Sequence, residues 1–310
     1  MSDRMFTVSS SPHIRSNDTV QGIMRDVVIA LLPATIAGIY FFKMQGLLVI
    51  LASVLSCVGA EALWQKLTHR KVTIFDLSAV ITGLLLAFNL PAHVPLWLPV
   101  VGGFIAIIVV KQFFGGLGQN IVNPALAARA VLLASWPVHM TNWTVDGVSS
   151  ATPLGVLKEG GTAVAGLMDV FIGNTGGCIG ETSAIALLIG GAYLLYRRII
   201  SWHIPVSYIG TVFVLTTVIG RNGFMTGDGL FEILAGGLMI GAFFMATDYT
   251  TSPMSKKGHL VFGIGCGVLT ALIRIFGGYS EGVSYSILIM NLFVPLIDRY
   301  TAPKVFGEVK

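Results

Sequence analysis

Asp146-Gly147-Val148-Ser149-Ser150-Ala151-Thr152-Pro153-Leu154 is a short polar run in the middle of a very apolar chain. The run lies in the longest hydrophilic interval, residues 137–180, with about five hydrophobic segments on either side. A loop of this length without evident secondary structure is usually functional. Its small side chains leave the backbone accessible to a bulky group, and Pro153 disfavours a helical conformation at Thr152. Taken alone, the run is also typical of an Asx or Ser/Thr turn that enters a loop.

The composition is that of a membrane protein. Of the 310 residues, 54% are hydrophobic and 11% are charged, and the mean hydropathy is +0.81. Because soluble domains carry about 25% charged residues, we expect one integral membrane domain and no separate soluble domain. The polar N-terminal residues lack the apolar core of a cleavable signal peptide. The net charge of +4 lies in loops beside apolar segments, which indicates a topology signal and contact with anionic lipid instead of nucleic-acid binding.

The sequence contains apolar runs that approach the length of a spanning helix, about 20 residues. They lie at 24–42, 44–63, 75–90, 95–114, 120–136, 181–197, 204–220, 230–247, 257–276 and 282–298. These runs predict an all-α integral membrane protein with about ten transmembrane helices. The fifth run contains Pro124, which is tolerated near a helix start, and Arg129. An arginine inside a membrane normally faces a partner or a cavity.

The runs divide the chain into five parts. We expect a cytoplasmic N-terminal segment (1–25), a first five-helix group (26–136), an outer loop (137–180), a second five-helix group (181–298) and a cytoplasmic tail (299–310). With the N-terminus in the cytoplasm, fourteen of the 19 lysines and arginines, Lys111 among them, fall on the cytoplasmic side. The others are Lys43, Lys158, Arg221 and Arg274 on the opposite side and Arg129 within a run. The positive-inside rule therefore puts both termini inside and the Thr152 loop outside.

The two halves of the chain resemble each other. Phe114-Gly115-Gly116 aligns with Phe276-Gly277-Gly278 at an offset of 162, and Pro91 falls on Pro253 at the same offset. Each match alone is of a common kind, but their shared order favours a duplication. Because five segments per half is an odd number, the repeats are expected to be inverted in the membrane.

Thr247-Asp248-Tyr249-Thr250-Thr251-Ser252-Pro253 is a second polar stretch, and it follows a glycine-rich apolar segment. Asp248 at a helix end, with the hydroxyls of Thr247 and Thr251, offers hard oxygen ligands to Na⁺, and acids inside membranes often mark ion paths. An N-cap or turn aspartate at the membrane surface explains the same pattern. The corresponding stretch of the first half, residues 89–93, lacks an acid, so any cation site is expected to be asymmetric.

The remaining acids, cysteines and histidines indicate no catalytic residue and no metal enzyme. Five acids lie near segment ends, where snorkelling or pairing with helix dipoles accounts for them: Asp26, Glu61, Asp76, Glu181 and Glu232. For Glu61 and Asp76 we expect surface pairing with the basic residues at 66, 70 and 71. The three cysteines are far apart, so this chain alone cannot hold a four-thiolate iron–sulfur cluster, and the histidines lack metal-ligand spacing.

The polar run fits the pattern Asp-x-x-Ser-x-Ala-Thr. This pattern resembles the flavinylation motif of proteins that carry FMN through a phosphoester bond to the threonine hydroxyl. Its position between two apolar halves resembles the NqrB/RnfD family, which contains the D-type subunits of Rnf complexes and the B-type subunits of Na⁺-translocating NADH:quinone reductases. The resemblance implies FMN on Thr152, with Asp146, Ser149 and Ala151 in a signature that a flavin transferase reads. The family often has Gly at the position of Ser150, which is also small.

Two further stretches carry the resemblance. Gly115–Leu126 is similar to the family's Gly-rich/Asn-Pro-Ala-Leu stretch, and Met245-Ala246-Thr247-Asp248 to a signature whose aspartate is linked to the cation path. Arg129 is expected to neutralise a flavin phosphate or a membrane carboxylate, or to form a structural ion pair. The resemblance also implies two inverted five-helix repeats like those of urea transporters. It further implies a noncovalent riboflavin within the bundle, whose ligands the sequence does not identify.

By this resemblance, the chain is expected to be an electron-transferring membrane subunit of an Rnf-type ferredoxin:NAD oxidoreductase in a prokaryotic cytoplasmic membrane. Electron flow through FMN would be coupled to outward movement of Na⁺ or H⁺. The implied partners are the FMN-carrying G-type subunit, the iron–sulfur membrane subunits, a flavin transferase and membrane lipid. Chain length and the short N-terminus favour the D-type over the longer B-type of the quinone reductase.

Two other classes of function fit parts of the pattern. Inverted repeats with acids in the membrane also fit a secondary transporter of a small solute, which has no need of a covalent flavin. A purely structural scaffold for other subunits would leave Thr152 unmodified and replaceable. A covalent flavin therefore discriminates among the three.

Overall fold

The computed structural model describes residues 19–141, 143–145, 148–149, 152–158, 166–173, 175–220 and 223–303. Most of these residues are helical. The strands of the described chain form two short antiparallel hairpins, β1 (Thr144–Val145) with β2 (Val148–Ser149) and β3 (Ile219–Gly220) with β4 (Gly223–Phe224). The prediction of a mainly helical protein is therefore confirmed.

The first helix, α1 (Val20–Leu67), joins two of the predicted runs in one 48-residue element. The Thr19 hydroxyl caps it by accepting from Gly22 N at 3.1 Å. A straight helix of this length would extend about 70 Å, more than twice the ~30 Å thickness of a bilayer's hydrocarbon core. The backbone turns at Lys43, where φ is 53° and ψ is −137°. α1 therefore has two arms, separated where the sequence predicts a boundary between runs.

The next two helices and the π-helical segment after them pack against α1. α2 (Ser78–Phe88) follows the short 3₁₀ helix η1 (Ile74–Asp76), and α3 (Trp97–Phe104) continues as the π-helical η2 (Ile105–Gln112) before α4 (Pro124–Ser135). A Cβ on Gly83 would lie 2.7 Å from the Val54 Cα, so glycine permits the close approach of α2 to α1. Pro124 lies in the first turn of α4, where a proline was expected to be tolerated.

Between the two groups of helices, the described chain forms α5 (Pro137–Met140), the β1–β2 hairpin, α6 (Pro153–Lys158) and α7 (Leu167–Ile172). It then enters the core beside the end of α2. Ile179 N and Gly180 N donate to the carbonyls of Leu90 and Phe88, each at 3.1 Å. This pairing supplies hydrogen-bond donors to carbonyls at the C-terminal end of α2, which a helix leaves without intrahelical partners.

The second group contains α8 (Ala184–Tyr196), α9 (His203–Val218), α10 (Gly229–Leu234), α11 (Leu238–Ile240), the π-helical η3 (Gly241–Met245), α12 (Lys256–Phe276) and α13 (Val283–Thr301). α9 and α12 approach closely because glycines of α12 face small side chains of α9. A Cβ on Gly263 would meet Ser207, and one on Gly267 would meet Thr211. Small residues at such contacts are typical of helices that pack within a membrane.

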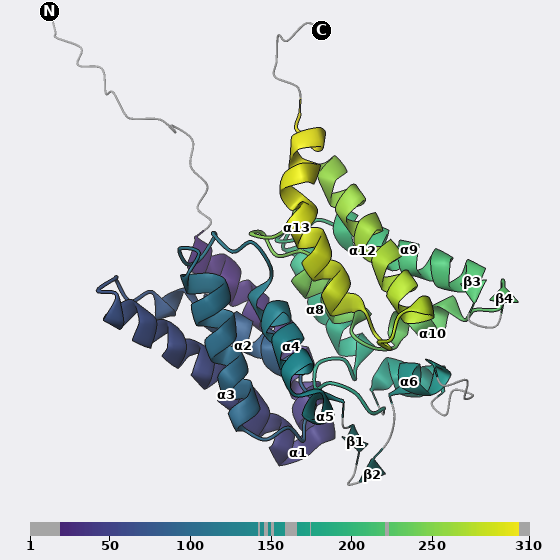
Figure 1. Cartoon of the computed structure of the whole chain (residues 1–310), viewed down its shortest axis with the longest axis horizontal. Helices are drawn as coiled ribbons and strands as arrows, with labels where there is room; N and C mark the ends of the chain where they lie inside the picture. The colour runs from purple at the N-terminus through teal and green to yellow at the C-terminus, as the bar shows by residue number, and fades with distance from the viewer. Residues whose placement is uncertain are drawn as a thin grey trace, which may run out of the picture.

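Figure 1 shows the two groups side by side, α1–α5 in purple to teal and α8–α13 in green to yellow. α1 contacts α8, and α4 contacts α13. One continuous core draws buried side chains from both groups, among them Leu31, Phe88, Leu126, Leu187 and Ile287. The start of α1 and the end of α13 lie on the same side of the molecule, and α6 and the β1–β2 hairpin lie on the opposite side (Figure 1).

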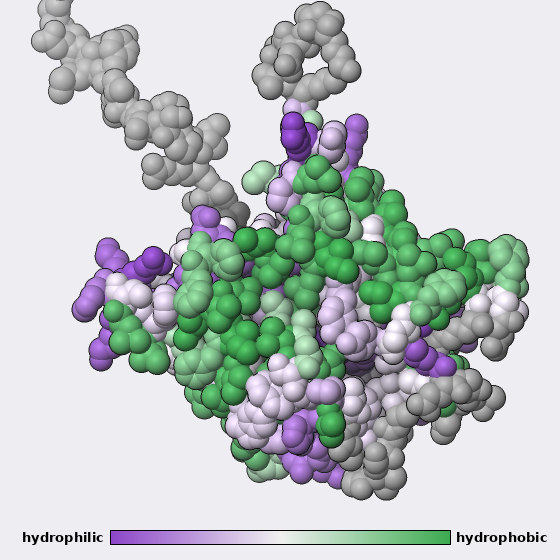
Figure 2. Space-filling model, in the orientation of Figure 1, coloured by the Kyte–Doolittle hydropathy of each residue, from purple (hydrophilic) through white to green (hydrophobic). Residues whose placement is uncertain are grey.

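The surface is largely apolar. Figure 2 shows hydrophobic residues over most of the described surface in that view, with hydrophilic residues mainly at its ends. Large apolar side chains such as Ile36, Leu55 and Leu292 are more than half exposed, which is the pattern expected where lipid and not water surrounds the helices. By length and composition, α1 and α12 are long and apolar enough to cross a membrane.

One buried ion pair contradicts a prediction. Lys111, expected on the cytoplasmic surface, lies in η2 and is 2% exposed, and its Nζ is 2.9 Å from Glu61 Oε1. The prediction that Glu61 pairs with basic residues on the surface is therefore wrong. An enclosed carboxylate needs a partner that is enclosed with it, because each charge has lost its water. Asp76 caps α2 instead, since its Oδ1 accepts from Ser78 N at 2.9 Å.

A second pair also corrects the assignment of charges to loops. Arg274 was expected in an outer loop, but it is fully buried within α12, and its Nη1 lies 3.1 Å from Glu232 Oε2. At the other end of the molecule, Asp26 forms a partly exposed pair with Arg197 at 2.9 Å. Asp26, Glu61 and Glu232, three of the five acids near segment ends, are therefore held by specific cations, which the sequence pattern does not identify.

Candidate functional site

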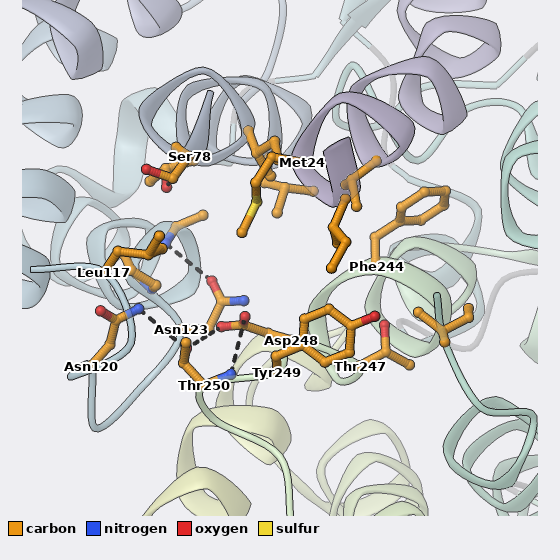
Figure 3. Close-up of a pocket in the computed structure, with 18 of the residues that line it drawn as sticks. Met24, Ser78, Leu117, Asn120, Asn123, Phe244, Thr247, Asp248, Tyr249 and Thr250 are labelled. Carbon is orange, nitrogen blue, oxygen red and sulfur yellow. Dashed lines mark hydrogen bonds between the residues drawn. The ribbon is translucent and has the colours of Figure 1, made fainter. Parts of the chain in front are cut away.

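A cavity of about 110 Å³, here called the central pocket, lies between the two groups of helices near the start of α1. Apolar side chains form most of its wall, and polar groups gather where the chain leaves η2 and η3 (Figure 3). The lining residues that matter below are Met24, Ser78, Lys111, Leu117, Asn120, Asn123, Phe244, Thr247, Asp248 and Thr250. Both halves of the chain therefore contribute to one site, as is common for ligand sites between helices.

A hydrogen-bond chain joins the two halves at this pocket. Asn120 Nδ2 donates to Thr250 Oγ1 at 3.3 Å, and Thr250 Oγ1 donates to Asp248 Oδ2 at 2.9 Å (Figure 3). Thr251 Oγ1 also donates to Asp248 Oδ2, at 3.2 Å. Asp248 is therefore held by hydroxyls of the turn after η3, close to an amide from the other half.

The ends of two helices meet beside the pocket. Asn123 caps α4 by accepting from Ala125 N at 3.1 Å, and its Nδ2 donates to Met245 O at 3.4 Å, where η3 ends. Asn89, at the end of α2, donates to Leu85 O at 2.6 Å and lies 3.8 Å from the Met245 sulfur. The two polar stretches at 89–93 and 247–253 thus follow helix ends that approach each other in the core.

The residues predicted for a cation path are only partly brought together. Thr247 and Asp248 line the central pocket, and the Thr247 hydroxyl donates to Phe243 O at 2.7 Å. Thr251 is buried and contacts Asp248 through its hydroxyl. In the described residues there is no group of three or more His, Cys, Asp or Glu side chains able to hold a metal ion. A Na⁺ path through Asp248 remains a prediction.

The predicted flavin attachment residue lies at the opposite end of the molecule, in a second site that we call the outer pocket. Thr152 is 6% exposed and precedes α6, and its Oγ1 accepts from Gly155 N at 3.1 Å. The outer pocket is also lined by Gly176, Gly236, Glu181 and Glu281. Of the other motif residues, Ser149 lies in β2, and Asp146, Ser150 and Ala151 fall outside the described residues.

Arg129 belongs to a buried ionic cluster beside the outer pocket. Its Nη2 lies 2.7 Å from Glu281 Oε2 and 3.8 Å from Glu181 Oε1, and its Nη1 donates to the Ser284 hydroxyl. Arg274 Nε donates to the Glu281 backbone carbonyl at 3.1 Å, which connects the Arg274–Glu232 pair to this cluster. The contacts that the structure describes for Arg129 are ion pairs with carboxylates, which is one of the roles expected for this residue.

Reasoning from the sequence missed Glu281 and assigned Glu181 only to snorkelling or to pairing with a helix dipole. Both are at least nine-tenths buried, and their shared cation comes from a helix more than 50 residues away along the chain. The available signal was the presence of acids in a chain with only 11% charged residues. A charge inside such a chain is costly unless it is paired, but the identity of its partner depends on tertiary packing.

Residues 7–307 match the NQR2, RnfD, RnfE family. The chain belongs to this family. A relative from Acetobacterium woodii, named as the D subunit of a Na(+)-translocating ferredoxin:NAD(+) oxidoreductase complex, is 50% identical, and the alignment covers 100% of this chain and 98% of that protein. A Clostridium ljungdahlii relative is named as the D subunit of a proton-translocating ferredoxin:NAD(+) oxidoreductase complex. It is 48% identical, and the alignment covers 98% of this chain and 96% of that protein.

A more distant relative from Aliivibrio salmonicida, named as the D subunit of an ion-translocating oxidoreductase complex, is 36% identical, with 98% of this chain and 99% of that protein covered. The NQR2, RnfD, RnfE family resemblance stated from the motifs is thereby confirmed over the length of the chain. The names of these relatives differ in the ion that they give, Na⁺ in one and H⁺ in another.

Proposed function

We propose that this protein is the D subunit of an ion-translocating ferredoxin:NAD⁺ oxidoreductase complex. The observation that carries the proposal is near-complete alignment, at about half identity, with two D subunits of such complexes. The protein passes electrons within the complex in a prokaryotic cytoplasmic membrane and acts together with the other subunits. The expected neighbours are the flavin-carrying G-type subunit and the iron–sulfur membrane subunits.

Thr152 carries FMN through its hydroxyl in this proposal. Two observations support the fit. Thr152 Oγ1 lies at the start of α6, where it accepts from Gly155 N, and backbone N–H groups at a helix start favour a phosphate. Glycines at 176, 177 and 236 line the adjacent pocket, and nothing lies within 4 Å of the Cβ position of Gly177, so a group can approach the backbone there. The FMN supplies one- and two-electron chemistry, while the protein fixes its position and electrostatic surroundings.

The central pocket is our proposed site for the noncovalent riboflavin. A flavin ring has apolar faces and a polar edge, and the pocket offers apolar side chains at Met24, Leu117 and Phe244 together with the amide of Asn120 (Figure 3). The Lys111 ammonium is already bound to Glu61 and to the Ser78 hydroxyl at 2.6 Å. The pocket therefore suits a flavin without phosphate better than FMN.

The proposed architecture is a pair of inverted five-helix repeats of the urea-transporter type, ten spans in all. Contacts between α1 and α8, the first helices of the two groups, and between α4 and α13, the last ones, support an approximate two-fold relation. The start of α1 and the end of α13 lie on one side, and α6, which directly follows Thr152, lies on the other (Figure 1). By the positive-inside rule, the first side is cytoplasmic.

Electron flow is coupled to outward movement of Na⁺ or H⁺ in this proposal, with Asp248, Thr247 and Thr251 on the cation path. Asp248 lies in the pocket assigned to riboflavin, at the meeting of the two halves. A change of flavin charge there would act directly on the affinity of a nearby carboxylate for a cation. The coupling therefore needs no long pathway between the redox group and the acid.

The test of the covalent flavin is a denaturing gel viewed under ultraviolet light. The protein is co-expressed with a flavin transferase, alongside Thr152→Ala and the control Thr141→Ala, whose hydroxyl donates to the Pro137 carbonyl. We expect a fluorescent band in the wild type and the control and none in Thr152→Ala. Absence of fluorescence in every sample, with the transferase active on another substrate, would contradict the flavin assignment and favour a secondary transporter.

A further inference from the structure

Glu181 is the carboxyl of the outer cluster that has no cation of its own. Its side chain is 2% exposed, and neither side-chain oxygen has a hydrogen-bond partner in the described residues. The nearest guanidinium nitrogen, Arg129 Nη2, is 3.8 Å from Oε1, beyond hydrogen-bond distance. The same nitrogen is 2.7 Å from Glu281 Oε2, so Arg129 is committed to Glu281.

The other groups that face Glu181 do not supply a positive charge. Arg274 pairs with Glu232 and donates to the Glu281 backbone. The Cys178 thiol lies 3.3 Å from the Asn89 carbonyl and donates to it. The remaining neighbour is the Glu281 carboxyl, which lines the same pocket as Glu181 and lies beside the same guanidinium nitrogen, Arg129 Nη2.

Two buried carboxyls that line one pocket beside a single guanidinium are stable when one proton is held between them. An additional ionised carboxylate without a donor is strongly disfavoured in such surroundings, and neighbouring carboxylates commonly hold one proton between them. The chain also leaves space for this arrangement, because a Cβ on Gly237 would lie 2.5 Å from Glu181 Oε1. The site is thus a built proton site and not an incidental group of acids.

We propose that Glu181 and Glu281 form a proton-binding pair in the outer pocket, with Glu181 protonated in the resting protein. Thr152 lines the same pocket, so loss of the proton adds one negative charge close to that residue. This consequence rests on the proposed function, because it concerns a flavin on Thr152. A negative charge nearby disfavours the more negative, reduced flavin, so deprotonation of the pair lowers the flavin's midpoint potential.

Infrared spectroscopy of the protein in lipid tests the protonation without any flavin. The wild type and Thr152→Ala are expected to show the C=O stretch of a protonated carboxyl that shifts in D₂O. Glu181→Gln should lose this band, and Glu181→Asp should restore a carboxyl band at a shifted frequency. Asp26→Asn is the matched control, since Asp26 is paired with Arg197 at 2.9 Å, and it should leave the band unchanged.

The second measurement is the midpoint potential of the Thr152-linked flavin as a function of pH. In the wild type, the midpoint potential should fall additionally over the pH range in which the pair loses its proton. Glu181→Gln should lack this additional fall, and Asp26→Asn should keep it. A band that persists in folded Glu181→Gln, or no protonated-carboxyl band in the wild type, would overturn the proposal. If Thr152 carries no flavin, only the second measurement is lost, so the two failures are distinguishable.

Discussion

The buried ion pair between Lys111 and Glu61 forms in place of the surface pairing that the sequence suggests for Glu61. Lys111 Nζ reaches both Glu61 oxygens and the Ser78 hydroxyl, and Gln112 Nε2 donates to Glu61 at 2.8 Å. A buried pair is weak support for stability compared with apolar packing, but removal of one partner leaves the other charge uncompensated. The pair therefore fixes the position of η2 relative to α1 and the start of α2.

Lys111→Met should lower the free energy of unfolding by about 3–5 kcal/mol, because Glu61 is left buried without its cation. The double variant Lys111→Met/Glu61→Gln should recover most of that loss, since no net charge remains inside. Unfolding in mixed micelles measures both, with the exposed Lys66→Met as a control within about 0.5 kcal/mol of the wild type. Equal losses in the single and double variants would show that packing, not charge, holds this region.

Asp248→Asn should weaken ion transport by the assembled complex by roughly tenfold or more, since a hydrogen bond or ion contact to a charged group is worth about 1.5–3 kcal/mol. Asparagine keeps the size of the side chain and can still accept from Thr250. Covalent flavin on Thr152, at the far end of the molecule, should be unchanged on the denaturing gel. Loss of that flavin as well would indicate misfolding instead of a specific role for Asp248.

Among the helices, α1 and α8 approach each other closely at a glycine. A Cβ on Gly190 would overlap the Ala30 carbonyl oxygen, so the two backbones are in contact there. Helices in lipid gain little from the hydrophobic effect between them and rely on such close packing. The contact joins the first helix of one group to the first helix of the other.

Gly190→Ala should therefore destabilise the protein by about 1–3 kcal/mol, the usual cost of forcing extra volume into a packed contact. Gly210→Ala is the matched control in α9, because nothing lies within 4 Å of its Cβ position, and alanine there gains about 0.5–1 kcal/mol of helix propensity. The midpoint of thermal unfolding in detergent should fall for the first variant and stay or rise for the second. A similar shift in both would argue against the α1–α8 contact.

The apolar runs were sufficient to predict where the main helices lie, because a membrane helix can be recognised from the length and hydropathy of its segment alone. The pattern predicted the boundary between two runs at Lys43, but it did not predict that 105–112 and 241–245 are π-helical. These features depend on local backbone geometry. The pattern also failed for pairs such as Arg129–Glu281 and Lys111–Glu61, whose members come together only by folding. The prediction of a flavin on Thr152 comes from its motif and not from its surroundings.

At the level of the whole molecule, exposed residues suitable for labelling lie at both ends of the helical body. Met254, beside the end of α13, is 93% exposed, and its N–H donates to Asp298. Val138, in α5 on the side of α6, is 75% exposed. The three native cysteines, at 57, 178 and 266, are buried. Single introduced cysteines at these two positions therefore report on the two faces separately.

In intact cells, a membrane-impermeant maleimide should label Val138→Cys and not Met254→Cys. Both should be labelled after the membrane is broken, and the wild type should stay unlabelled in each case. This pattern follows from the positive-inside rule, which places the termini in the cytoplasm. Labelling of Met254→Cys alone in intact cells would reverse the orientation and put the Thr152 pocket on the cytoplasmic face.

The pairing of residues 179 and 180 with the end of α2 also bears on how the protein is made. The Leu90 and Phe88 carbonyls receive their donors from a segment that leaves the ribosome about 90 residues later. A polar backbone group without a partner is costly in hydrocarbon. During synthesis, these carbonyls of the first group of helices therefore lack the donors that the connecting segment supplies later.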